Sequence, residues 1–116
     1  MKNQLHKKFS FIKKNRLSNN YDFENVLKNG KHFKCEFFAL KILKNNLEYS
    51  RLGIRINKKI GNSVKRNKIK RIIREIFRIN KNEFNENIDI VVIPYSNILS
   101  ANFDTIREEF LKFLSH

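Results

Sequence analysis

Residues 58–75 constrain the fold most, because this stretch is densely basic and yet keeps the apolar spacing of a helix. At about 100° per residue from Val64, one arc of the helical wheel, from about 80° to about 220°, collects apolar side chains: Ile69, Ile72, Ile73, Ile76 and Phe77. A second arc, from about 240° to about 340°, collects polar and cationic ones: Asn67, Lys70, Arg71, Arg74 and Arg78. A disordered charge run has no such spacing. The stretch therefore predicts a helix that packs one face on a core and presents cations on the other.

The positive charge of the chain is concentrated in two places. The net charge is +14, and residues 51–81 hold twelve Lys or Arg and a single acid, Glu75. Residues 1–16 add six Lys or Arg and no acid, whereas residues 82–116 are net −4. Such a distribution is typical of a nucleic-acid binder. An anionic membrane ranks lower because the Ile-rich side of the helix is expected in a core. Glu75 is expected to pair with Arg71 or Arg78.

Length and composition predict one domain over residues 1–116, with a basic and mobile arm at residues 1–17. Cys35 is the single cysteine, so an intramolecular disulfide and a cysteine-based zinc site are excluded. The three histidines are far apart in sequence and indicate no metal or general-base cluster. No apolar run approaches the roughly 20 residues of a membrane span, and we expect a cytoplasmic protein.

The elements are predicted as helix, strands, helix, strand and helix, which is an α+β sandwich with a small mixed sheet. The first helix begins at Ser18 or Asn19 and stops at Gly30. Strands follow at residues 32–44, with a bulge near 34–36, and at residues 51–57, where Leu52, Ile54 and Ile56 share one face. Residues 61–63 cap the basic helix. Residues 88–93 form a central strand stopped by Pro94, and residues 103–114 form a closing amphipathic helix.

The basic stretch resembles the signature of the bacterial ribonuclease P protein subunit. Its core reads Arg66-Asn67-x-x-Lys70-Arg71-x-x-Arg74-Glu75, preceded by Lys58-Lys59-Ile60-Gly61-Asn62-Ser63. The resemblance extends to Arg16-Leu17, Tyr21-Asp22-Phe23, residues 26–30 and Arg51-Leu52-Gly53-Ile54, so it covers essentially the whole chain. It implies a ribosomal-S5-domain-2-like sandwich with a left-handed βαβ crossover.

The resemblance also implies the function. In that family the catalytic RNA removes the 5′ leader from precursor tRNA with Mg²⁺, and the protein binds both the RNA and the leader. We expect Mg²⁺ on the RNA and substrate, no metal held stably by this chain, and no obligate protein partner. The residues expected to contact the catalytic RNA are Lys58, Lys59, Arg66, Asn67, Lys68, Lys70, Arg71 and Arg74.

The single-stranded leader is implied to lie between the first helix and the sheet. The expected contacts, on aromatic rings and on a positively charged strand face, are Phe23, Phe33, Arg51, Arg55 and Asn57. Leu27 and Lys41 depart from the family, which often has aromatic residues at these two positions. For Phe23 and for Phe33, a place in the core is an equal alternative.

Two other functions are considered. A structural RNA binder, such as a small ribosomal protein, fits the charge and the fold, but the signature at residues 58–75 argues against it. A self-sufficient protein ribonuclease would need a general acid and a general base beside a phosphate site. The sequence shows no convincing His, Tyr or carboxylate constellation for that chemistry, so no catalytic residue is assigned.

Overall fold

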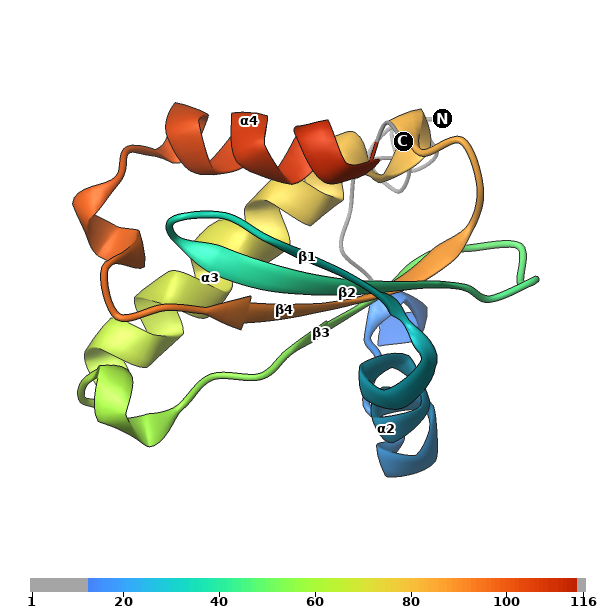
Figure 1. Cartoon of the computed structure of the whole chain (residues 1–116), viewed down its shortest axis with the longest axis horizontal. Coiled ribbons are helices and arrows are strands. Elements are labelled where there is room, and N and C mark those ends of the chain that lie inside the picture. The colour runs from blue at the N-terminus through green and yellow to red at the C-terminus, as the bar shows by residue number, and fades with distance from the viewer. Residues whose placement is uncertain (1–12, 115–116) are drawn as a thin grey trace.

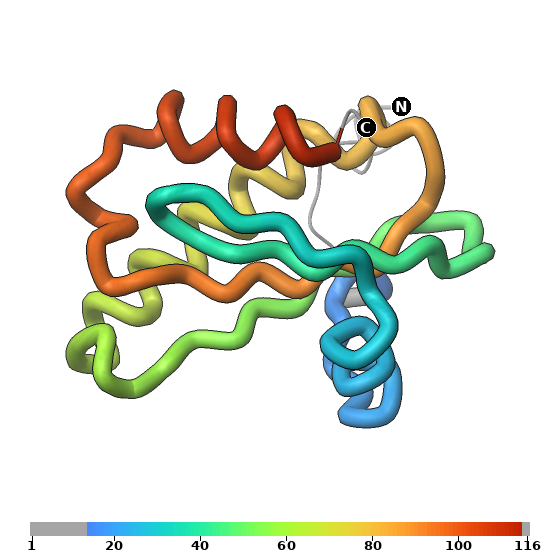
Figure 2. Tube along the Cα trace, viewed as in Figure 1, coloured from blue at the N-terminus to red at the C-terminus, as the bar shows by residue number. Residues whose placement is uncertain are grey.

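A four-stranded mixed sheet organises residues 13–114, the part of the chain that this computed structural model describes. The strands are β1 (Lys31–Lys34), β2 (Phe38–Lys44), β3 (Arg51–Ile54) and β4 (Ile88–Pro94), in the order β1-β2-β4-β3. The β1/β2 and β2/β4 pairs are antiparallel, and the β3/β4 pair is parallel. Figure 2 shows the order by colour, with the late orange strand between two earlier ones. The predicted α+β class with a small mixed sheet is confirmed.

Three helices cover the sheet unequally. α3 (Ser63–Asn80) and α4 (Phe103–Leu114) pack on one face, whereas α2 (Asn20–Asn29) packs on the other, near one end of the strands (Figure 1). The rest of the lower face in Figure 1 has no helix over it. α3 joins the parallel strands β3 and β4, so these three elements form the expected βαβ unit. Its handedness stays a prediction.

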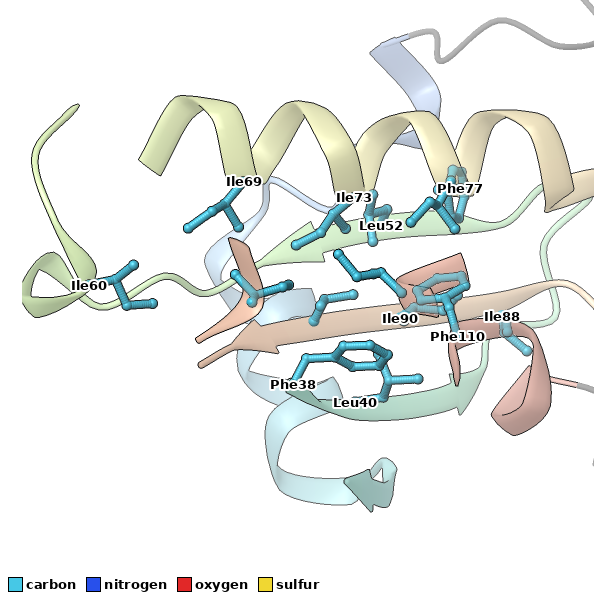
Figure 3. Packing of buried hydrophobic residues seen from close by; sticks show 14 residues of the cluster. Phe38, Leu40, Leu52, Ile60, Ile69, Ile73, Phe77, Ile88, Ile90 and Phe110 are labelled. Carbon is cyan, nitrogen blue, oxygen red and sulfur yellow. The ribbon is translucent and has the colours of Figure 1, made fainter. Parts of the chain in front are cut away.

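The core lies between the sheet and the pair α3 and α4 (Figure 3). The predicted apolar face of α3 is confirmed, since Ile69, Ile73, Ile76 and Phe77 are buried and Ile72 is half-buried. They meet strand residues of alternate positions, such as Leu40, Leu52 and Ile90. β4 is buried at nearly every position, as a central strand should be. A smaller cluster of Leu17, Val26 and Val91 attaches α2 to the opposite face.

Asparagine side chains fix the starts of both early helices. Asn19 accepts hydrogen bonds from the backbone N–H groups of Tyr21 and Asp22, and Asn62 accepts one from Lys65 N–H at 2.9 Å. The predicted capping of both helices is therefore confirmed. Within residues 13–114, no helix combines the length and the apolar character that a membrane span requires.

Three predicted boundaries are wrong. The strand predicted over residues 51–57 ends at Ile54. Residues 32–44 form a hairpin of β1 and β2 rather than one bulged strand, because the chain reverses where Cys35 N–H donates to the Phe38 carbonyl. Residues 13–17 belong to the folded body and not to the predicted arm. There η1 (Lys13–Asn15) precedes a bridge between Arg16 and Leu52, and Asn15 and Leu17 are buried. The remainder of the predicted arm lies outside the described residues.

Candidate nucleic-acid interface

The polar face of α3 points away from the core and gathers the predicted RNA contacts. Asn67 and Arg71 are exposed, and Lys70 and Arg74 are half-buried. A shallow cavity of about 380 Å³ lies along this face, one that a sugar-phosphate segment could enter. Its lining residues recur every three or four positions, as one face of a helix requires: Asn67, Arg71, Arg74, Glu75 and Arg78.

The charges on this face are only partly compensated. Glu75 binds Arg78 through both oxygens, one of them 3.0 Å from Nε, and this hydrogen bonding lowers the pKa of Glu75 and raises that of Arg78. The predicted role of Glu75 is thereby confirmed for Arg78. Burial lowers the pKa of Arg74, and the nearby charge of Arg16 lowers it further. Arg74 is therefore a cation in a cationic setting, which favours an anionic ligand.

The other predicted RNA contacts lie around the start of α3. Lys58 and Lys59 are exposed on η2 (Lys58–Ile60), which is anchored by the buried Ile60. Lys68 is exposed and Arg66 is half-buried, with Nη2 of Arg66 donating to Ser63 Oγ at 3.3 Å. These cations surround a helix N-terminus, where backbone N–H groups also attract anions. The structure thus places all eight predicted contacts on η2 and α3.

A second surface lies on the sheet face that carries α2. The ring of Phe23 packs against Gly53 of β3, where a Cβ atom would come within 2.6 Å of Phe23 Cε2. Arg55 follows two residues later on the same side, exposed, and its N–H continues the parallel ladder by donating to Val92 O at 2.9 Å. Asn57 is exposed beyond it and accepts a hydrogen bond from Lys59 N–H. The structure therefore brings Phe23 and Arg55 to one side of the β3 ladder and places Asn57 just beyond its end.

Arg51 is a structural residue, contrary to its predicted place in the leader-binding set. Its Nε and Nη2 donate to the two carboxylate oxygens of Asp89, at 2.8 and 2.6 Å, and Nη1 donates to Asp22 at 3.1 Å. The hydrogen bonds to Asp89 raise the pKa of Arg51. With its guanidinium engaged on all three nitrogens, Arg51 joins α2 to β3 and β4 and offers no open fork to RNA.

Phe33 does not join Phe23, because the two rings lie on opposite faces of the sheet. Phe33 pairs with Leu40 across the β1/β2 ladder and so points toward α4, where its ring centroid is 5.3 Å from that of Phe113. The core alternative therefore holds for Phe33. Its position follows from the hairpin turn, which the sequence interpretation missed.

Sequence reasoning also missed how α2 is attached to the sheet. Asp22 and Asp89 lie far apart in sequence, yet both bind Arg51. Gly53 received no structural role, although a glycine inside a strand often marks a close approach. Leu27 is half-buried in the α2 cluster, and Lys41 lies opposite His32 on the α2 side.

A metal site of protein ligands is not supported by the described part of the chain. Residues 13–114 contain no group of three or more His, Cys, Asp or Glu that could hold an ion. The expectation that Mg²⁺ is held by RNA and substrate stays a prediction.

Comparison with known proteins agrees with this geometry. A family model described as Ribonuclease P matches residues 11–116. The ribonuclease P protein component of Thermotoga maritima is 42% identical over 109 residues, covering 90% of this chain and 93% of that protein. The component of Syntrophus aciditrophicus is 40% identical over 103 residues, covering 88% and 87%.

Solved structures give the same result. The RNase P protein from Thermotoga maritima superposes with a TM-score of 0.77 at 43% identity, covering 85% of this chain and 94% of that one. The RNase P protein from Staphylococcus aureus superposes with a TM-score of 0.75 at 34% identity, covering 86% and 91%. Sequence and fold therefore agree over most of both chains.

Proposed function

The chain belongs to the ribonuclease P protein family, and from this premise we propose that its two faces divide the binding of two RNAs. As the protein component of ribonuclease P, it serves in 5′ processing of tRNA, and catalysis lies on the RNA subunit. The proposal concerns which surface meets which RNA.

The polar face of α3 binds the catalytic RNA. The observation that carries this proposal is the row of cations on α3, whose opposite face is committed to the core, so the row has a fixed direction and spacing. Lys58, Lys59, Arg66 and Lys68 add contacts at the start of the helix. Each phosphate neutralised releases counterions, so binding should weaken steeply with salt.

The α2 side of the sheet binds the single-stranded leader of precursor tRNA. Phe23 provides a ring on which a base of any sequence can stack, and Arg55 and Asn57 provide polar contacts in the segment that follows β3. Arg51 and Phe33 are no longer in this set. Without these two residues, the leader-binding surface consists of the Phe23 ring over Gly53 and of Arg55 and Asn57 further along the chain.

The protein contributes affinity and orientation, while Mg²⁺ supplies its chemistry on the RNA and the substrate. Binding leader and catalytic RNA at once holds the scissile bond in register with the RNA's active site. Cations on the protein also reduce repulsion between the two RNAs, so the protein should matter most at low Mg²⁺.

The experiment is leader removal from a precursor tRNA at low Mg²⁺, with a bacterial ribonuclease P RNA, with and without this protein. We expect cleavage that depends on the protein when the RNA is present. Protein alone should not cleave. Tight, salt-sensitive binding without stimulation would instead favour a structural RNA binder, and cleavage by RNA-free protein would favour a self-sufficient nuclease.

A further inference from the structure

Cations from three separate segments gather beside the C-terminal half of α3. Lys14 lies in η1 and Arg16 directly after it, Arg74 and Arg78 lie on α3, and Lys81 begins η3 (Lys81–Glu83). Burial is the main cause that lowers the pKa of Lys81, and the charges of Lys14 and Arg78 lower it further. Arg16 acts in the same way on Arg74. Lys81 is therefore close enough to Lys14 and Arg78 to be repelled by them, and Arg74 is close enough to Arg16.

Buried contacts hold this cluster in place. The Asn15 side chain is only 2% exposed; its Nδ2 donates to Ser50 O at 2.8 Å, and its Oδ1 accepts from Lys81 Nζ at 3.1 Å. Leu17 N–H donates to Leu52 O at 2.9 Å, which fixes the segment after Asn15 along the outer edge of β3. The chain thus positions the cations of residues 14–16 next to those of α3.

Two of these five cations, Lys14 and Arg74, have no carboxylate partner among residues 13–114. Glu75 binds Arg78 from the α3 side. Arg74 is one of the two although it is half-buried. Lys14 contacts a ring rather than an acid, with Nζ 5.1 Å from the centroid of Tyr49. Like charges held together in this way cost folding free energy, which a bound polyanion would offset.

We propose that Lys14, Arg16 and Lys81 extend the catalytic-RNA interface beyond α3, so that a second stretch of phosphate backbone is bound between residues 14–16 and the C-terminal half of the helix. This proposal rests on the proposed function of α3. From Arg71 to Lys81 the row follows roughly 15 Å of helix axis, which is too long for one phosphate and suits a continuous strand. Arg16 and Lys14 form the opposite side of the track.

The test is the salt dependence of binding to the catalytic RNA for Arg16→Gln and Lys81→Gln. Lys28→Gln is the matched control, because Lys28 is exposed on α2 and its loss changes the net charge by the same amount. We expect each cluster variant to flatten the slope of log K against log salt by about one unit, and Lys28→Gln to leave it unchanged. Slopes equal to that of the control would overturn the proposal.

Urea unfolding of the free variants separates binding from folding. Both substitutions relieve repulsion between like charges, and both also lose contacts of the original side chain. Because these two effects oppose each other, we expect little net change in the free energy of unfolding. A loss of affinity matched by a loss of stability would show that the cluster is structural, and would also overturn the proposal. Arg71→Ala, titrated alongside, reports on α3 itself. If the salt slope of Arg71→Ala also stays unchanged, the proposed function of α3 fails. If Arg71→Ala flattens the slope and the two cluster variants do not, only the extension fails.

Discussion

The ring of Phe23 lies so close to Gly53 that a Cβ atom at residue 53 would stand 2.6 Å from Phe23 Cε2 and 3.0 Å from Cδ2. The missing side chain lets α2 approach β3. The ion pairs of Arg51, two residues before Gly53, with Asp22 and Asp89 stabilise this approach. The half-buried ring therefore has a fixed position with one part still accessible.

Gly53→Ala should displace the Phe23 ring and weaken leader binding. Base stacking on an aromatic side chain contributes about 1–3 kcal/mol, so we expect roughly a tenfold loss of affinity for leader-bearing precursor and none for mature tRNA. The measurement is equilibrium binding of both tRNAs to protein assembled with catalytic RNA. Phe23→Ala should give the same selectivity. An equal loss for both tRNAs would contradict the assignment.

The sequence predicted what depends on local periodicity and missed what depends on distant pairing. The helical wheel of α3 correctly assigns Ile73 to the core face and Arg71 to the polar face, because the geometry of a single helix fixes where both side chains point. Strand alternation likewise places Arg51 and Arg55 on one face. It cannot show that Asp89, 38 positions further on, engages Arg51 and not Arg55. That distinction requires the parallel register of β3 and β4.

The same limit explains the errors at Phe33 and at residues 13–17. The direction of Phe33 depends on a reversal at residues 35–37 that has no Gly, Pro or Asn to mark it. In the segment before α2, the lysines suggested a solvated arm. Asn15 and Leu17 are buried there because they meet Ser50 and Leu52, far away in sequence.

Arg51→Ala and Arg55→Ala should have opposite consequences although both remove one arginine from the same side of the sheet. Arg51→Ala leaves the buried carboxylate of Asp89 unpaired, and we expect a loss of about 2–3 kcal/mol in unfolding free energy. This value is below the full range for buried pairs because the Arg51 side chain retains 18% exposure. Leader preference should not change. Arg55→Ala should leave urea unfolding unchanged and reduce precursor affinity. If Arg51→Ala reduced precursor affinity and Arg55→Ala reduced stability, the roles assigned to the two arginines would be wrong.

Phe33→Ala should affect stability and spare leader preference. The half-buried ring packs against Phe113 on the α4 side, so its removal should cost on the order of 1–3 kcal/mol in thermal or urea unfolding. The ratio of precursor to mature tRNA affinity should equal that of the unmodified protein. A changed ratio in folded protein would return Phe33 to the leader-binding set.

Arg71→Ala and Arg74→Ala should each flatten the salt slope for catalytic RNA by about one unit, and the double variant by about two. Additivity is expected because the two side chains are nearly a helical turn apart and meet different phosphates. Filter binding or fluorescence titration over a salt series provides the slopes. A double variant no flatter than either single one would mean that both arginines meet the same phosphate.

Lys81 should make the stability of the free protein rise with pH in the alkaline range. Burial, Lys14 and Arg78 lower its pKa from 10.5, so between the folded and unfolded values the unfolded chain binds more protons. The free energy of unfolding then increases as pH rises through this window. Lys81→Gln does not titrate, so the difference between the two proteins isolates the effect of Lys81 from that of other lysines.

Urea unfolding of both proteins from about pH 8 to about pH 10, at constant salt, measures this difference. If the difference in the free energy of unfolding between the two proteins stays flat or falls as pH rises, the lowered pKa of Lys81 is contradicted.

Binding of catalytic RNA should depend on pH in the opposite direction. Phosphates beside Lys81 favour its charged form, so binding takes up protons and affinity should fall as pH rises through the same window. Lys81→Gln should lose both effects together, because one ammonium group produces them.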